Sequence, residues 1–288
     1  MEIVQWEARP RLRRPILVAA FEGWSDGADA ASTAMSHLID TWSARPFASI
    51  DPEDFFDFTA TRPRVRLDDD LVRRIEWPEN QLLAAPLPAS NHDVVLLSGT
   101  EPHLRWKTFC SGLVGAIQSL GVEMVVTLGA LLADVAHTQP VRVTGTAADP
   151  DLAERLNLRR SRYEGPTGIL GVLSDALAKA DIPTASLWAA VPHYVAQTPS
   201  PKAALALVER AASLLGVTAD VVDLQLASSA YERKVTELVQ NDPDVAEYVA
   251  QLERDDDTGP DADSPLEIGG VDELAAEVER FLRGHGPK

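Results

Sequence analysis

Cysteine and long apolar runs are scarce in this sequence of 288 residues. Its single cysteine, Cys110, excludes an internal disulfide framework and a metal site built from several cysteines. No apolar run reaches the roughly 18 residues that cross a bilayer, because Asp134 interrupts the longest candidate, Met124 to Ala136. The N-terminal stretch lacks an apolar core of the length that a signal peptide needs. We therefore expect a cytoplasmic protein that does not enter a membrane.

Basic residues are also few. The chain has 26 Lys and Arg against 44 Asp and Glu, which gives a net charge of −18, and five of the basic residues are Lys. Nucleic acids and anionic membranes need a basic footprint on their protein partner, so the charge argues against both. Residues 217–288 carry 18 acidic and 6 basic residues, and this last quarter therefore holds two thirds of the acidic excess.

Several common catalytic and nucleotide-binding motifs are missing. The sequence contains neither a G-x-x-x-x-G-K-[ST] nor a G-x-G-x-x-G nucleotide loop, and no H-E-x-x-H zinc motif. No cofactor and no metal is therefore predicted, and no catalytic residue is assigned.

What the sequence does have is a series of short apolar segments alternating with amphipathic helical patterns. Apolar runs without polar alternation are typical of strands buried on both faces. Such strands are predicted at 16–21, 93–97, 123–128 and 185–191. A helical stripe follows the first of them, made of Ala31, Ala34, Met35, Leu38 and Trp42. The alternation predicts an α/β domain with a largely parallel sheet over residues 1–216.

The clearest unit is the stretch from Tyr163 to Gly216. Leu170, Leu173 and Leu177 form one face of a helix that ends before Pro183, and the strand at 185–191 follows. Ser200 is a good N-cap and Pro201 a good first helical residue. Gly216 stands where a left-handed C-cap belongs. This segment therefore predicts helix, buried strand and helix in succession.

Other segments depart from this alternation. Residues 60–78 predict an antiparallel β-hairpin that leaves the sheet, because Arg64 to Leu67 alternates polar and apolar residues before a turn of aspartates. Leu82 and Leu83 form a short apolar run that Pro86 ends. Residues 98–102 and 129–140 are predicted to be loops, the second of them long and apolar. Residues 141–146 alternate again and predict a strand.

Beyond Gly216 the strand patterns stop. One helical stripe is predicted from Val221, Leu224, Ser228, Tyr231, Val235 and Leu238. Asn241, Asp242 and Pro243 start a second helix, so residues 217–254 are predicted to form a helical hairpin. Residues 255–270 are acidic and rich in Asp, Gly and Pro, which is typical of a linker. Residues 271–288 predict a short amphipathic helix and a tail.

Candidate functional residues follow three of the predicted strands. Glu22, Ser25 and Asp26 come after the first strand, at a place where α/β folds bind ligands. Helix capping explains Ser25 and Asp26 equally well. Glu101 and His103 follow the strand at 93–97 and are candidates to line the same rim, with a solvated loop as the alternative.

Two histidines complete the candidate pocket. His137 lies in the apolar loop, and His193 follows the strand at 185–191. A histidine at the carboxyl end of a strand serves as acid, base or ligand, or as a hydrogen-bonded structural residue. A triad of Ser25 with either histidine and an aspartate has no supporting spacing.

A set of segments in this order resembles a known family. They are FEGWSDGAD, SGTEP, TLGALLADVAHTQPVRVTG, YEGPTGILGVL and SLWAAVPHYVAQTPSPKAALALVE. Together they resemble the bacterial form of the proteasome assembly chaperone 2 family, over about residues 16–216 and more loosely beyond. GPTG and PHY…PSPKA are fairly specific in combination, whereas each alone is a weak signal.

The resemblance implies a three-layer α/β/α domain similar to phosphorylase/hydrolase-like folds, with a C-terminal helical extension. It also implies a homo-oligomer, for instance a trimer, with proteasome subunits as candidate partners. Members have also been labelled ATP-grasp-related carboxylate–amine ligases. Members that dock on proteasome rings are expected to use a hydrophobic-Tyr-any tail. This sequence ends Gly-His-Gly-Pro-Lys, so docking through another surface is the open alternative.

Two functional hypotheses follow. The first is a cytoplasmic, oligomeric binding protein or assembly chaperone without catalysis. The second is a small-molecule hydrolase, phosphorylase or ligase whose pocket lies at the carboxyl ends of the strands. A pocket of the second kind requires the four candidate segments to converge on one concave polar surface.

Overall fold

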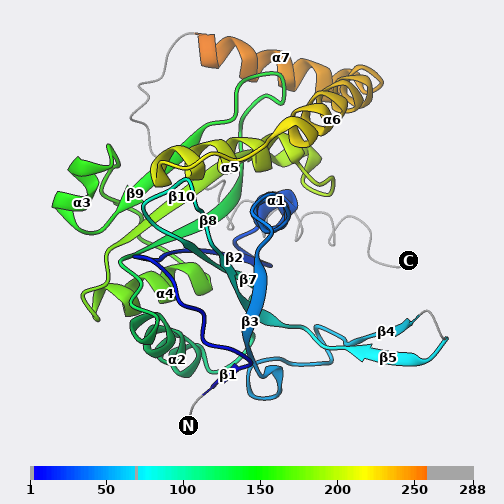
Figure 1. Cartoon of the computed structure of the whole chain (residues 1–288). Coiled ribbons are helices and arrows are strands. Elements are labelled where there is room, and N and C mark those ends of the chain that lie inside the picture. The colour runs from blue at the N-terminus through cyan, green and yellow to red at the C-terminus, as the bar shows by residue number, and fades with distance from the viewer. Residues whose placement is uncertain (1–2, 69–70, 258–288) are drawn as a thin grey trace.

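An eight-stranded sheet forms the centre of the molecule (Figure 1). The structure is a computed structural model that describes residues 3–68 and 71–257. The strands, in their order across the sheet, are β1 (Val4–Trp6), β3 (Arg45–Ile50), β6 (Asn80–Ala85), β7 (Val94–Thr100), β2 (Ile16–Glu22), β8 (Met124–Ala133), β10 (Thr184–Pro192) and β9 (Val143–Ala147).

The sheet is mixed. The four central strands β7, β2, β8 and β10 run parallel to one another, as the buried-strand patterns predict. The strands on both sides of this centre pair antiparallel. The expected α/β fold is confirmed, with the parallel pairing confined to the middle of the sheet.

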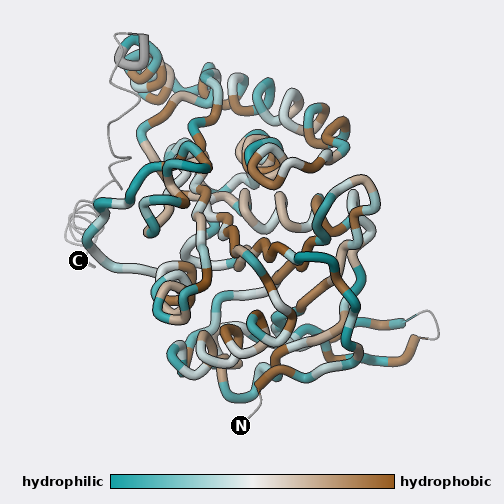
Figure 2. Tube along the Cα trace, turned by 60° about the vertical axis from the view of Figure 1, so that its left-hand side comes forward, coloured by the Kyte–Doolittle hydropathy of each residue, from teal (hydrophilic) through white to brown (hydrophobic). Residues whose placement is uncertain are grey.

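Helices cover the sheet on both faces, which makes the three-layer α/β/α arrangement. The helices α1 (Ala30–Thr41) and α5 (Pro201–Leu215) pack on one face, and α2 (Trp106–Ser119) and α4 (Ile169–Ala178) pack on the other. The predicted stripes Ala31 to Leu38 and Leu170 to Leu177 are buried in the two resulting cores. Figure 2 shows the most hydrophobic stretches of the chain running through the middle of the molecule.

The ends of α5 follow the predicted capping. The Ser200 hydroxyl accepts a hydrogen bond from the backbone N–H of Ala203, and Pro201 is the first helical residue. Gly216 ends the helix with a φ of 64°, a left-handed conformation that glycine adopts without a steric penalty.

The strands β7 and β8 extend well beyond their predicted ends, and β6 was not predicted as a strand. β7 continues to Thr100, and β8 continues to Ala133, so the loops predicted from residues 98 and 129 begin too early. β6 fills the apolar run at Leu82 and Leu83, which carries no alternation because both sides of this strand are buried. Tertiary pairing explains the extension of β8, because its additional residues pair with β10 as far as Ala133, which lies opposite Pro192.

The predicted hairpin is present as a separate two-stranded ribbon, β4 (Arg64–Leu67) and β5 (Arg73–Glu76). It projects from the body at the side where the sheet ends with β1 and β3 (Figure 1). A short helix, α3 (Pro150–Arg155), follows β9.

The last described elements are α6 (Val222–Gln240) and α7 (Pro243–Asp257). They share a small core with Ala136, in which Tyr231, Val235, Val239 and Val249 are buried. The predicted stripe is wrong at its end, because Leu238 is exposed and Val239 faces the core instead. α7 extends through the first three residues of the predicted acidic linker. The rest of that linker and the predicted helix and tail at 271–288 lie outside the described residues.

Among the described residues, no helix combines the length and the apolar character that a bilayer span requires.

A buried carboxylate ties the start of β2 to the loop before β7. Asp93 accepts hydrogen bonds from the backbone N–H groups of Arg13 (2.8 Å) and Leu87 (3.0 Å) and from the Arg13 guanidinium (2.6 Å). The hydrogen bond from the Arg13 side chain lowers the pKa of Asp93 to about 2. The stabilisation is therefore present above the pKa of an unfolded aspartate, near 3.8, and is lost as the pH falls toward 2.

We predict that Asp93→Ala lowers the free energy of unfolding by about 2–3 kcal/mol, because it leaves buried donors unpaired. Glu123→Ala, which removes the exposed partner of Arg14, is the control and changes it by less than about 1 kcal/mol. Urea unfolding at pH 7 measures both variants. Equal losses in the two variants would contradict the prediction.

Candidate functional site

The candidate residues lie near the edge of the sheet where the parallel strands end. Glu22 ends β2, and its carboxylate accepts a 3.4 Å hydrogen bond from Thr100, the last residue of β7. The backbone N–H of Glu101 donates to the carbonyl of Glu22 over 2.8 Å. The ends of the two strands are thus joined directly.

Ser25 and Asp26 are buried in the turn that follows β2. One oxygen of Asp26 accepts the backbone N–H groups of Ala31 (2.6 Å) and Ser32 (3.2 Å), so this side chain caps α1 as the sequence predicts. Burial raises the pKa of Asp26, and the hydrogen bonds from Ser32 and Ala31 oppose that shift. The other oxygen of Asp26 and the Ser25 hydroxyl are buried without a hydrogen-bond partner among the described residues.

Glu101 connects this turn to α4. Its carboxylate accepts the backbone N–H of Trp24 over 3.2 Å and the backbone N–H of Ile169, the first residue of α4, over 2.7 Å. A negative charge at a helix N-terminus is favourable. Gly168 allows the close approach, because an added Cβ would lie 2.7 Å from the Ser25 hydroxyl and 2.8 Å from the Glu101 carboxylate. We call Trp24, Ser25, Asp26, Glu101 and Gly168 the Glu101 cluster.

His103 belongs to a different group of contacts. Its Nδ1 accepts the backbone N–H of Asp57 over 3.1 Å, and its Nε2 lies 3.3 Å from the Thr61 hydroxyl. Its ring also packs edge-on against Phe56. His103 therefore holds the segment that leads to the β4–β5 ribbon.

His137 is buried between the end of β8 and the helical pair α6–α7. The Tyr194 hydroxyl accepts the backbone N–H of His137 over 2.7 Å and lies 2.8 Å from its Nδ1. The Nε2 lies 3.0 Å from the Thr236 hydroxyl, which itself donates to the carbonyl of Glu232. A neutral imidazole with its proton on Nε2 satisfies all these groups.

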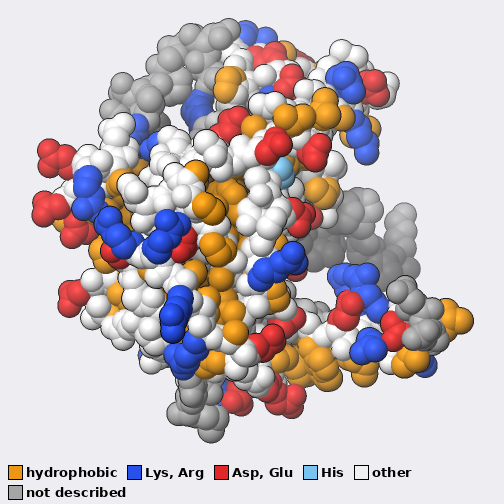
Figure 3. All heavy atoms as spheres, viewed as in Figure 1, with side chains coloured by type: hydrophobic (Ala, Val, Ile, Leu, Met, Phe, Trp, Pro, Cys, Tyr) orange, Lys and Arg blue, Asp and Glu red, His pale blue; other side chains and the backbone are white. Residues whose placement is uncertain are grey.

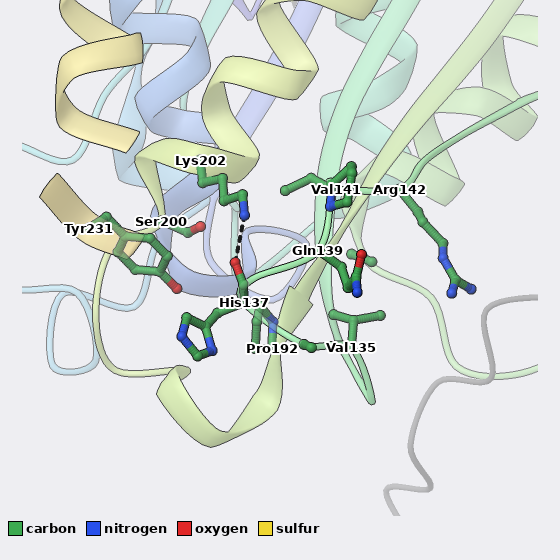
Figure 4. A pocket seen from close by; sticks show the side chains of 12 residues that line it. Val135, His137, Gln139, Val141, Arg142, Pro192, Ser200, Lys202 and Tyr231 are labelled. Atoms are coloured by element: carbon green, nitrogen blue, oxygen red, sulfur yellow. Dashed lines mark hydrogen bonds between the residues drawn. The ribbon is translucent and has the colours of Figure 1, made fainter. Parts of the chain in front are cut away.

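The surroundings of His137 favour that neutral form. Burial, and secondly the charge of Lys202, lower its pKa below 6.5. The Lys202 ammonium donates to the carbonyl of His137 over 2.6 Å (Figure 4). It also donates to the Glu232 carboxylate over 2.6 Å. A lysine of α5, a histidine of the β8 end and a glutamate of α6 are thus linked.

His193 makes the second connection to the helical pair. Its Nδ1 lies 3.0 Å from the carboxylate of Asp134, which also accepts the hydroxyl of Tyr248 from α7 over 2.9 Å. The rings of His193, Tyr194 and Tyr248 pack edge to face. Both histidines therefore fasten α6 and α7 to the end of the sheet.

The structure brings together Glu22, Ser25, Asp26 and Glu101. It places His103 in a second group and His137 with His193 in a third. A small recess shown in Figure 4 is lined by His137 together with Val135, Gln139, Val141, Arg142, Ser200 and others. In the part of the chain that is described, no three His, Cys, Asp or Glu side chains are grouped as a metal site requires.

Comparison with known proteins places this geometry in a family. A family model described as the PAC2 family matches residues 20–239. The chain belongs to the PAC2 family. A PAC2 family protein from Streptomyces avermitilis is 48% identical, with a TM-score of 0.77 over 82% of this chain and 99% of that one.

Two further structures extend the comparison. A proteasome-assembly chaperone homologue from Mycobacterium tuberculosis is 46% identical, with a TM-score of 0.74 over 81% of this chain and 99% of that one. PbaB of Pyrococcus furiosus, an archaeal proteasome activator, shares the fold at 18% identity, with a TM-score of 0.65 over 82% of this chain and 97% of that one. No curated protein matches the chain. The ATP-grasp-related label finds no support in these relatives.

Sequence reasoning missed the partners of the predicted residues in this PAC2 chain. Tyr194 stands next to His193 in the sequence, yet its contacts with His137 come from the parallel pairing of β8 and β10. Thr236 and Lys202 lie far from His137 in the sequence and carry no motif. The GPTG segment, which ends in Gly168, stands out in the sequence. Only the fold shows how closely Gly168 approaches Glu101.

We predict that Gly168→Ala lowers the free energy of unfolding by about 1–3 kcal/mol, because the new methyl group overlaps Ser25 and Glu101. Gly115→Ala in α2 is the matched control, since an added Cβ there meets nothing within 4 Å. It should stabilise the protein by about 0.5–1 kcal/mol. Chemical unfolding measures both variants. An unchanged free energy of unfolding in Gly168→Ala would show that the Glu101 cluster is loosely packed and would contradict the prediction.

A second prediction concerns pH. Because the folded protein lowers the pKa of His137, the unfolded state binds the proton more tightly, and stability falls as the pH drops below about 6.5. Protonation would also place a hydrogen on Nδ1 against the hydroxyl of Tyr194. Unfolding free energies between pH 7.5 and 5.5 should fall less steeply for His137→Gln than for the wild type. His37→Gln, a partly exposed histidine of α1, should retain the wild-type slope.

Proposed function

We propose that this PAC2-family chain is a cytoplasmic, homo-oligomeric binding protein that assists the assembly of proteasome subunits and catalyses no reaction. The observation that carries the proposal is the 46% identity, over four fifths of the chain, with a structure described as a proteasome-assembly chaperone homologue. The archaeal proteasome activator adds a second relative of the same fold.

The contacts at the strand ends support a role without catalysis. Asp26 caps a helix, Glu101 fastens two backbone segments, and His137 and His193 hold α6 and α7. A general acid or base needs access to a substrate proton. These groups instead bond to other segments of their own chain. The candidate residues also form three groups rather than one concave surface, which disfavours the enzyme alternative.

One observation favours that alternative, a small-molecule hydrolase, phosphorylase or ligase. The Ser25 hydroxyl and one oxygen of Asp26 are buried without a partner among the described residues, and buried polar atoms normally have one. An active site there would lie between the ends of β2 and α4. If it exists, Ser25→Ala abolishes turnover of its substrate while leaving protein binding intact.

The proposal predicts specific retention of proteasome subunits. The full chain, tagged and expressed in its own host, should enrich proteasome α and β subunits identified by mass spectrometry, and purified subunits should bind it directly. Light scattering should give a mass that is a multiple of 31.2 kDa. An unrelated acidic protein with the same tag is the control. A strictly monomeric chain that retains no proteasome subunit would contradict the proposal.

A further inference from the structure

Residues 155–162 form a basic segment on the surface of a strongly acidic protein. The segment contains four arginines and no acidic residue, although Glu154 and Glu164 flank it. All four arginines are exposed. The chain as a whole has a net charge of −18. A surface segment with charge of one sign favours a partner of the opposite sign, so this segment fits an acidic partner.

The basic segment runs along one edge of the central sheet. The backbone N–H of Arg159 donates to the carbonyl of Gly145 over 3.0 Å, and the carbonyl of Arg159 accepts the N–H of Ala147 over 2.9 Å. The segment therefore lies directly beside β9. Several apolar residues at this edge are only partly buried, namely Val141, Val143, Leu156 and Leu158.

Basic and apolar side chains thus share one surface. We call Val143, Arg155, Leu156, Arg160 and Arg162 the arginine flank. In Figure 3 basic side chains gather on the side of the molecule that carries α3 and β9 in Figure 1. A partner of this surface needs acidic residues beside apolar ones.

The chain itself contains a segment of this kind. Residues 255–279 hold ten acidic residues and no basic one. The predicted amphipathic helix at 271–282 begins within them, and its apolar stripe consists of Leu274, Val278 and Phe281. A helix of this length is too short to be stable alone in water and needs a surface to pack on.

The described part of the chain ends near the arginine flank. Glu253, close to the end of α7, accepts the hydroxyl of Thr138 over 2.5 Å, and Thr138 belongs to the loop that leads into β9. In Figure 1 the orange end of α7 lies toward the side that carries α3 and β9. Residues 258–270 connect α7 to the predicted helix and span up to about 40 Å when extended, which is enough to reach the flank.

We propose that residues 271–282 bind to the arginine flank of their own chain. The apolar stripe packs on Val143 and Leu156, and the acidic residues face Arg160 and Arg162. Each ion pair at a surface is weak. Tethering compensates for this weakness, because a segment on a short linker has an effective concentration on the order of 1 mM. While the segment is bound, no other acidic partner has access to the flank, whether or not the chain binds proteasome subunits.

Hydrogen exchange of the full-length protein, followed by mass spectrometry, tests this contact. Arg160→Glu combined with Arg162→Glu should raise the exchange rate of residues 271–282 about tenfold, because two attractions become repulsions. Arg233→Glu with Lys234→Glu, at two exposed positions of α6, is the matched control and should leave that rate unchanged. An unchanged rate in the flank variant, or equal increases in both variants, overturns the proposal.

The reciprocal variant changes the segment and measures the flank. Phe281→Asp removes the largest apolar side chain of the stripe, and should raise the exchange rate of residues 156–163 about threefold or more. Raising the NaCl concentration to about 1 M should act like the arginine reversal, because it screens exposed charges. Exchange of residues 271–282 in the wild type at the rate of an unstructured peptide would refute the contact.

Two further arms identify where the segment binds. The flank variant keeps an intact segment and Phe281→Asp an intact flank, so binding within one chain leaves each protein in an equimolar mixture as fast as it is alone. Restored protection in the mixture indicates binding to a second copy and overturns the proposal. Arg64→Glu with Arg73→Glu reverses two exposed charges of the β4–β5 ribbon. Faster exchange of residues 271–282 in this variant alone assigns the segment to the ribbon and likewise overturns the proposal.

Discussion

Burial of the four parallel strands on both faces is the constraint on which the rest of the structure depends. Helices cover both sides of β7, β2, β8 and β10, so their backbone groups have no access to water and must pair along the full length of the strands. The strands then end near one edge of the sheet. Polar side chains in the following loops must hold those ends, which is the role of Glu101 between Trp24 and Ile169 and of Asp26 at the start of α1.

The helical pair α6–α7 is held in a different manner. Its shared core is small. Leu224 of α6 packs in the larger core beside α5, and side chains at the ends of β8 and β10 bond to both helices. Lys202 adds to this junction, because one ammonium group bonds to the carbonyl of His137 and to the carboxylate of Glu232. The polar ties fix the orientation of α6, since buried hydrogen bonds are directional and apolar burial is not.

The sequence was sufficient for the central strands and for the caps of α5, because these features depend on neighbouring residues. The limits of prediction have a physical cause in each case. β6 was not predicted as a strand because its apolar run is short, lying between Gln81 and Pro86, and its pairing partners β3 and β7 are supplied only by the fold. β8 is longer than expected because β10 supplies pairing partners up to Ala133. At the candidate site, the residue types after each strand were found, but their division into three groups depends on partners such as Tyr194 and Thr236, which are distant in the sequence.

The edge of the sheet at which α/β proteins commonly bind ligands is closed in this PAC2 chain by its own segments. Gly168 brings the loop before α4 so close to Ser25 and Glu101 that a methyl group would not fit, and His137 has each ring nitrogen engaged. Surface for recognition is left on the elements outside the three layers, namely the ribbon and the outer side of α6. A fold built in this way positions peripheral elements on a rigid centre, which is the arrangement that the proposed binding role requires.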